Sequence, residues 1–191
     1  MQANYASPVD RLLTLGDPHQ FSEWPDYMEY GLAEEHIPEL IRMTTDMDLH
    51  NADNADGKST EVWAPLHAWR ALGQLHAELA VEPLVSILDL DDDWIGEELP
   101  VVFGMIGTRA IPALAKYLSD QSHEVSPRAC AANGLEKIAN NHPEVRNQCL
   151  EILMSQLDRS SENDPTLNGL LISSLIHNER AGGFADYPEG S

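Results

Sequence analysis

The residues best suited to chemistry are carboxylates that crowd one turn and the helix start after it: Asp89, Asp91, Asp92, Asp93, Glu97 and Glu98. A hard cation such as Ca²⁺ takes oxygen ligands of this kind. The spacing differs from an EF-hand loop, because the alternating ligands, the central Gly and the terminal Glu are missing. Acidic residues also complement the dipole at a helix N-terminus. We therefore expect a solvated acidic turn, with contact to a basic partner protein as the functional alternative and a metal site as the least supported one.

Histidine spacing does not suggest a metal or acid-base centre. His67 and His76 would lie on nearly opposite sides of a helix, so they do not form the pair that binds zinc. The other histidines fall near expected helix ends and loops, where capping or solvent exposure is the ordinary role: His19, His36, His50, His123, His142 and His177.

The two cysteines, Cys130 and Cys149, do not have the paired spacing of a zinc motif, and we expect both to pack as small apolar residues. Cys130 lies in an Ala-rich apolar stretch, where a thiolate is disfavoured. The chain has no nucleophile elbow and no phosphate-binding glycine loop, since Gly104 and Gly107 lack a preceding strand. We expect no catalytic residue, no cofactor and no bound metal.

Two tryptophans offer an alternative binding surface. Trp63 and Trp69 are six positions apart on one expected helix, and Arg70 follows the second. Core packing is the ordinary role of such a pair. The functional alternative is an aromatic anchor beside Arg70 on an exposed face, since Trp and Arg are favoured at interface hot spots.

Helical periodicity runs through the chain, and no segment alternates like a strand. Ser-Pro pairs at Ser7 and Ser126 predict helix starts, Ser22 predicts a cap, and Gly31 and Gly107 predict helix ends. We expect capping helices at about 7–31, repeated helix pairs at about 34–158, a terminal helix at about 164–178 and a flexible tail at 181–191. Residues 50–59 predict an exposed loop between repeats.

These segments repeat the same sequence pattern, which is typical of stacked helical hairpins. We predict an all-α fold: a short right-handed α-solenoid of antiparallel helix pairs that forms a single domain over residues 1–180.

Acidic residues dominate the charge, with 32 Asp and Glu against 11 Lys and Arg, a net charge of -21. The imbalance is uneven: residues 1–108 carry -17 and residues 109–191 carry -4. Such a field repels nucleic acid and anionic lipid, so we expect neither as a direct partner. A basic protein is the partner that this charge favours.

Apolar runs are too short to cross a bilayer, and the first residues lack the basic and apolar regions of a signal peptide. We expect a cytoplasmic protein.

Two segments carry a resemblance: Ala-Leu-Gly-Gln-Leu-His-Ala-Glu-Leu-Ala-Val-Glu-Pro-Leu and Met-Ile-Gly-Thr-Arg-Ala-Ile-Pro-Ala-Leu-Ala-Lys-Tyr-Leu. They resemble bacterial HEAT-like repeats of the type named after phycobilisome lyases, in which a Leu-Gly or Ile-Gly pair precedes an apolar-Pro-x-Leu signature. The likeness covers about residues 24–158 and is strongest at 63–119. This chain departs from the pattern in the displaced Pro83, the loop at 50–59 and the links between helices. The resemblance implies the fold more than a function, because such repeats serve scaffolds, lyases and assembly factors alike.

The hypothesis with most support is a non-catalytic protein-interaction module or assembly factor that presents an acidic surface to a basic partner. The resemblance also implies a bilin lyase-like subunit or chaperone that binds a tetrapyrrole. A third alternative is an acidic mimic of nucleic acid that inhibits a nucleic-acid-binding protein.

Overall fold

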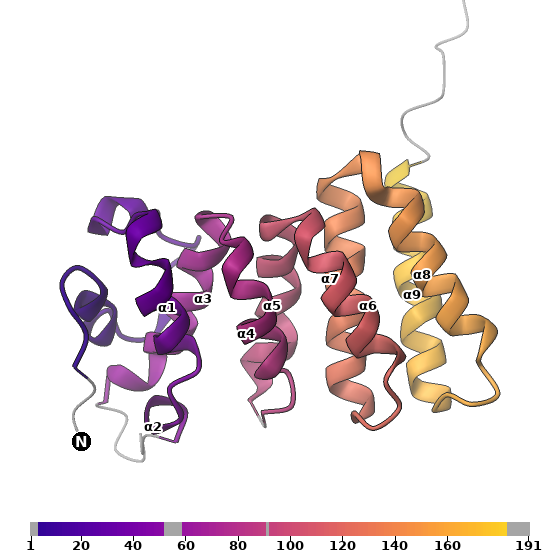
Figure 1. The fold of residues 1–191 in the computed structure, drawn as a ribbon, viewed down its shortest axis with the longest axis horizontal. Helices are drawn as coiled ribbons and strands as arrows, with labels where there is room; N and C mark the ends of the chain where they lie inside the picture. The colour runs from indigo at the N-terminus through magenta and orange to yellow at the C-terminus, as the bar shows by residue number, and fades with distance from the viewer. Residues whose placement is uncertain (1–3, 52–58, 91, 183–191) are drawn as a thin grey trace, which may run out of the picture. The chain divides into compact units, whose positions relative to one another are not determined.

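The computed structural model describes residues 4–51, 59–90 and 92–182, and within these ranges the protein is all-helical, without strands (Figure 1). Its α-helices are α1 (Ile37–Thr44), α2 (Met47–His50), α3 (Ala64–Gln74), α4 (Val81–Ser86), α5 (Asp93–Ile106), α6 (Ile111–Ser119), α7 (Val125–Asn141), α8 (Arg146–Asp158) and α9 (Pro165–Gly182). The all-α prediction is confirmed. Residues 52–58 of the predicted loop and 183–191 of the predicted tail lie outside the described ranges, and α9 continues beyond the predicted end at residue 178.

Short 3₁₀ helices precede or replace several of the predicted α-helices: Val9–Thr14, Pro18–Gln20, Tyr27–Tyr30, Glu34–His36, Glu61–Trp63, Glu78–Ala80, Thr108–Ala110 and Pro143–Val145. Contacts divide the chain into two compact units, Met1–Ile87 and Leu88–Ser191. Each unit is described by itself below.

Helix α3 is the centre of the first unit. Every residue from Ala64 to Gly73 is buried, including the polar ones. Helix α1 packs along α3 with Leu40 and Met43 fully buried. A helix that is covered all round does not offer the exposed face that an amphipathic pattern predicts.

Polar side chains on α3 fasten the irregular N-terminal segment to it. His67 is 0% exposed. Its Nε2 lies 2.8 Å from the Gly16 carbonyl oxygen, and its Nδ1 lies 2.7 Å from the Tyr27 hydroxyl. Because a carbonyl only accepts, a neutral His67 donates from Nε2 and accepts the Tyr27 proton at Nδ1. At the other end of α3, Gln74 accepts from the Tyr27 amide and donates to the Pro25 carbonyl, each over 2.9 Å.

Short 3₁₀ helices occupy the region where capping helices are predicted. Residues 7–31 form 3₁₀ turns because Gly and Pro interrupt every run before an α-helix can propagate. Asp26, not Ser22, caps the turn at Tyr27–Tyr30, through a 2.9 Å bond from the Met28 amide. Gly31 ends that turn in the left-handed region, with φ 90°, as predicted.

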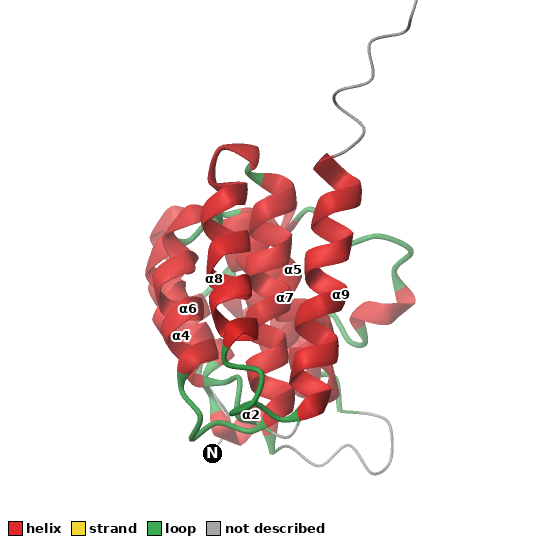
Figure 2. Cartoon of the chain, turned by 90° about the vertical axis from the view of Figure 1, so that its right-hand side faces the viewer, coloured by secondary structure: helices red, strands yellow, loops and turns green. Residues whose placement is uncertain are grey.

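Two layers make up the second unit. Helix α7 lies between α5 and α9 in one layer, and α6 and α8 pack against α7 from the other (Figure 2). The core between the layers is apolar, with these side chains buried: Leu99, Val102, Phe103, Leu114, Leu118, Leu135, Ile138, Cys149, Leu153, Leu167 and Leu171.

Helices α5 and α7 approach closely because glycines remove side chains at the contact. A Cβ on Gly104 would lie 2.7 Å from the Lys137 Cβ and 3.3 Å from the Lys137 carbonyl carbon. A Cβ on Gly134 would meet the Leu114 side chain at 3.0 Å and the Phe103 ring at 3.3 Å. The two backbones therefore pack at a separation that only glycine permits.

The tight turn after α5 follows the sequence prediction. Gly107 ends the helix with φ 89°. Side chains at the end of α7 contact one carbonyl in the last turn of α5. Asn141 Nδ2 donates to the Gly104 oxygen over 3.1 Å, and His142 Nε2 lies 3.2 Å from it. The same glycine thus permits the close approach and supplies the acceptor that fixes it. The Ser126 prediction is off by two positions, since the N-cap of α7 is Glu124 and its first residue is Val125.

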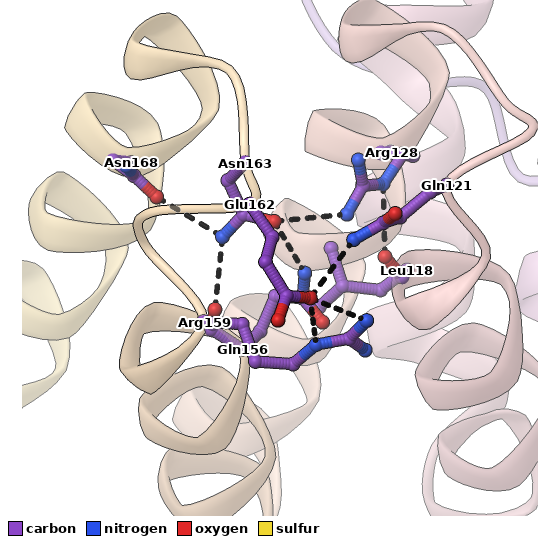
Figure 3. Close-up of polar contacts among 8 residues, drawn as sticks. All are labelled: Leu118, Gln121, Arg128, Gln156, Arg159, Glu162, Asn163 and Asn168. Carbon is purple, nitrogen blue, oxygen red and sulfur yellow. Dashed lines mark hydrogen bonds and ion pairs between the residues drawn. The ribbon is translucent and has the colours of Figure 1, made fainter.

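A buried guanidinium joins the loops at the far end of the second unit (Figure 3). Arg128 Nε donates to the Leu118 carbonyl over 2.9 Å, and an Nη donates to Asn163 Oδ1 over 3.3 Å. Asn163 in turn exchanges hydrogen bonds with Gln156, whose Nε2 donates to the same oxygen over 2.8 Å. Burial, followed by the charge of Arg159, lowers the pKa of Arg128.

An exposed ion pair completes this network. Arg159 donates to Glu162 Oε2 from two nitrogens, over 3.1 and 3.0 Å, and Gln121 reaches the same oxygen over 3.3 Å (Figure 3). The loop between α6 and α7 is therefore tied to the loop between α8 and α9.

Among the described residues, no single helix is both long and apolar enough to cross a bilayer. The segments Trp94–Ile106 and Thr108–Ser119 reach that composition only as a pair, bent by 115°.

The His67 contacts predict a stability effect. His67→Phe leaves the Gly16 carbonyl and the Tyr27 hydroxyl without this bond, and we expect the free energy of unfolding to fall by roughly 2–4 kcal/mol. Tyr27→Phe removes only one of the two bonds, so we expect a loss of about 1 kcal/mol. Urea unfolding of both variants measures the difference. Equal losses would contradict a bridging role for the imidazole.

The glycine contact predicts an inversion of helix propensity. Ala normally stabilises a helix relative to Gly by about 1 kcal/mol. We expect Gly104→Ala to destabilise instead, by roughly 1–3 kcal/mol, because its Cβ overlaps Lys137. Gly96 is the matched control in the same helix, since a Cβ there meets nothing within 4 Å. Thermal unfolding in which both Ala variants gain stability would refute the close approach.

Candidate functional site

Part of the predicted acidic turn lines a pocket of about 280 Å³ in the second unit. Asp89 and Asp92 line it from the segment before α5, and Glu124 lines it from the start of α7. The apolar side chains that line it include Leu88, Ile95, Pro127 and Cys130. We call this site the acidic pocket.

Helix starts position two of the three carboxylates. Asp92 is the N-cap of α5, and its Oδ1 accepts from the Trp94 amide over 2.9 Å. Glu124 occupies the N-cap position of α7 in extended conformation. Both acidic residues therefore lie at helix N-termini, where negative charge is favoured.

A histidine holds the third carboxylate. His123 Nδ1 lies 3.1 Å from Asp89 Oδ1, and its Nε2 lies 3.9 Å from Asp120 Oδ2. The imidazole stacks on the Tyr117 ring, with centroids 3.8 Å apart and planes at 18°. Hydrogen bonds from the Ser122 amide and hydroxyl lower the pKa of Asp120. His123 thus lies between two carboxylates and fixes Asp89 at the acidic pocket.

The Tyr117 hydroxyl under this histidine is buried. Burial, and then the neighbouring Asp89 carboxylate, raises the pKa of Tyr117. No hydrogen bond of good geometry reaches this hydroxyl within the described ranges, so Asp89 acts on it as a charged neighbour rather than as a well-aligned acceptor. Tyr117 therefore stays neutral and serves as a platform for the imidazole.

Neither thiol is suited to nucleophilic chemistry. Cys130 lies at the inner side of the acidic pocket with its Sγ 3.7 Å from the Ile95 carbonyl oxygen. Burial raises the pKa of Cys130 to about 12 and that of Cys149 to about 11. A thiolate, which is the reactive form, is therefore scarce at neutral pH.

A second pocket, of about 350 Å³, lies where α5, α7 and α9 meet. Its lining is polar and carries both signs of charge, with Glu97 from α5, Glu136 and Lys137 from α7, and His177 from α9. The His177 Nδ1 lies 3.8 Å from Glu136 Oε1. We call this site the polar pocket.

Two of the three residues of the tryptophan hypothesis are buried, and for Trp69 this agrees with the core-packing interpretation. Trp69 is 0% exposed, and Arg70 is 3% exposed with its guanidinium 4.6 Å from the centre of the Trp24 ring. Both are covered because α3 is buried on all sides, which a spacing argument does not reveal. Trp63 is half-buried and meets the His19 ring edge-on, with centroids 5.6 Å apart.

The other predicted acids separate. Asp91 lies outside the described residues, and for Asp93 only the backbone is described. Glu97 is exposed and lines the polar pocket, whereas Glu98 is only 7% exposed. Glu124 and His123 were not predicted, because they come from a loop far along the chain and no spacing pattern links them to the acidic turn.

Within the part of the chain that the structure describes, no three His, Cys, Asp or Glu side chains are grouped so that they could hold a metal ion. The acidic pocket is lined by acidic and apolar residues together, a combination that suits an organic cation with an aliphatic stem.

Comparison with protein-family models, with curated proteins and with solved structures finds no match for this chain.

Proposed function

We propose that this protein is a non-catalytic interaction module whose acidic pocket receives a Lys or Arg side chain of a partner protein. The observation that carries the proposal is the pocket itself: three acidic residues, Asp89, Asp92 and Glu124, line it together with apolar residues.

The two parts of a basic side chain match the two parts of the pocket. Lys and Arg bury an aliphatic stem against apolar surface and keep the charged head among polar groups. Leu88, Ile95 and Pro127 offer the apolar contact, and Asp89, Asp92 and Glu124 surround the head. Of the described residues that line the pocket, none is Lys or Arg, so no internal cation from its own wall competes for this position.

Both units carry a net negative charge, which supports a basic partner for either of them. Residues 1–87 carry 15 acidic against 4 basic side chains, net -11, and residues 88–191 carry 17 against 7, net -10. The unevenness seen at residue 108 therefore does not follow the boundary between units, because the acidic turn belongs to the second unit. Such a field raises association rates with cationic partners and weakens with salt.

The way in which the helix pairs stack also supports a role in protein binding. We infer that they stack as a short right-handed α-solenoid of the HEAT-like type. The layered packing of α5, α7 and α9 against α6 and α8 supports this within the second unit, as does the Ile-Gly turn at Gly107. Solenoids of this kind commonly act through protein binding along their length.

The proposal predicts a site-specific loss of binding. The probe is a fluorescein-labelled peptide of six arginines, measured by fluorescence anisotropy with the full chain at low salt. We expect Asp89→Asn, Asp92→Asn and Glu124→Gln together to weaken binding by about tenfold or more, because the cation loses its counter-charges. Asn at position 92 retains an N-cap.

A matched control removes the same charge elsewhere. Glu144→Gln, Glu151→Gln and Asp158→Asn alter exposed acids of the same unit that do not line the acidic pocket. We expect this variant to stay within about threefold of the native protein, as distant surface changes generally do. An equal loss in both triple variants would show diffuse attraction and reject the pocket.

A further inference from the structure

The acidic pocket and the polar pocket are neighbours on one surface of the second unit. Gly96 lines both of them, so the two hollows meet on α5 at a residue without a side chain. A Cβ at Gly96 would meet nothing within 4 Å, which shows that the junction is open. The two pockets together therefore form a path over α5 and along α7 towards α9.

The junction lies beside a helical hydrogen bond that cannot form. Pro100 lies inside α5 and has no N–H, so the helical bond that residue 100 would donate to the Gly96 carbonyl cannot form. Both residues at the ends of this missing bond line the polar pocket. A carbonyl released in this way is suited to accept a hydrogen bond from a peptide N–H.

Charge along the path favours a cationic occupant. The described carboxylates that line it are Asp89, Asp92, Glu97, Glu124 and Glu136, and the Lys side chain among its lining residues is Lys137. Glu136 has His177 as a partner, and Asp89 has His123. Glu97 and Glu124 are exposed.

We infer that this path binds an extended basic segment of the partner, with one basic side chain in the acidic pocket and the following residues across Gly96 into the polar pocket. The inference rests on the proposed function and specifies that the ligand is an extended peptide segment. From Ser126 to Lys137, α7 rises by about 16 Å, which about five residues of extended chain would span. The occupant is thus a short linear peptide rather than a single side chain.

A length series tests this inference with the full chain. Fluorescein-labelled peptides of two, four, six and eight arginines are titrated by anisotropy at low salt. We expect affinity to rise steeply up to about six residues and then to level, because longer peptides extend beyond the path. Diffuse attraction would instead give affinity that keeps rising with peptide charge.

Gly96→Phe blocks the junction without changing charge. We expect it to weaken binding of the six-residue peptide by about tenfold or more. Gly169→Phe is the matched control: Gly169 also lies in a helix of this unit with nothing within 4 Å of an added Cβ, and it lines neither pocket. We expect the control to bind within about threefold of the native chain. Thermal unfolding of both variants establishes that they are folded.

A second variant reports on the polar pocket alone. Glu97→Gln with Glu136→Gln keeps side-chain shape, and we expect it to weaken the six-residue peptide but not the two-residue peptide. If the six-residue peptide binds both Gly96→Phe and this variant with native affinity, the extended path is overturned. The proposed role of the acidic pocket would then still stand. Absence of binding by every arginine peptide would reject the proposed function itself.

Discussion

The second unit depends on the contact between α5 and α7. Gly104 and Gly134 remove the side chains that would separate these helices, and Asn141 and His142 then reach the Gly104 carbonyl. Because α7 also packs against α6, α8 and α9, this one contact positions both layers. The starts of α5 and α7, which carry Asp92 and Glu124, lie across the acidic pocket from each other for the same reason.

Buried polar groups complete the fold where apolar packing ends. In the first unit His67 and Gln74 hold irregular chain against α3. In the second, Arg128 and Asn163 join two loops (Figure 3). Each of these groups has specific partners, which makes burial tolerable and fixes one arrangement of the loops. The loop that Arg128 restrains also carries His123 and Glu124, so the network contributes to the shape of the acidic pocket.

The sequence predicts the helical segments well and their local details less well. Apolar spacing located the segments from α3 to α9, and Gly31 and Gly107 were read as helix ends because glycine alone adopts their φ angles freely. The capping helices predicted at about 7–31 are short 3₁₀ helices, because capping signals at Ser7 and Ser22 do not show how far a helix propagates. Spacing left open whether Trp69 and Arg70 pack in the core or form an exposed anchor, and both are buried.

Only some residues of the candidate site were predicted from the sequence. Composition marked Asp89 and Asp92. Glu124, which lines the pocket, and His123, which contacts Asp89, are brought there by tertiary packing of α7 on α5, which local pattern does not encode. Neither Pro100 nor Gly96 was predicted as a site residue. Their role at the junction of two pockets depends on the α7 surface at Ser126 and Asn133. These α7 residues lie more than 25 positions away in the sequence.

The claim that the acidic pocket receives a basic side chain is tested most directly by backbone amide chemical shifts. The full chain, labelled with ¹⁵N, is titrated with N-acetyl-arginine amide, a single basic residue without a charged terminus. The account predicts saturable shifts confined to the pocket, at residues such as Leu88, Gly96 and Ser126. Shifts spread over exposed acids such as Glu144 and Glu151, or none at all, would contradict it.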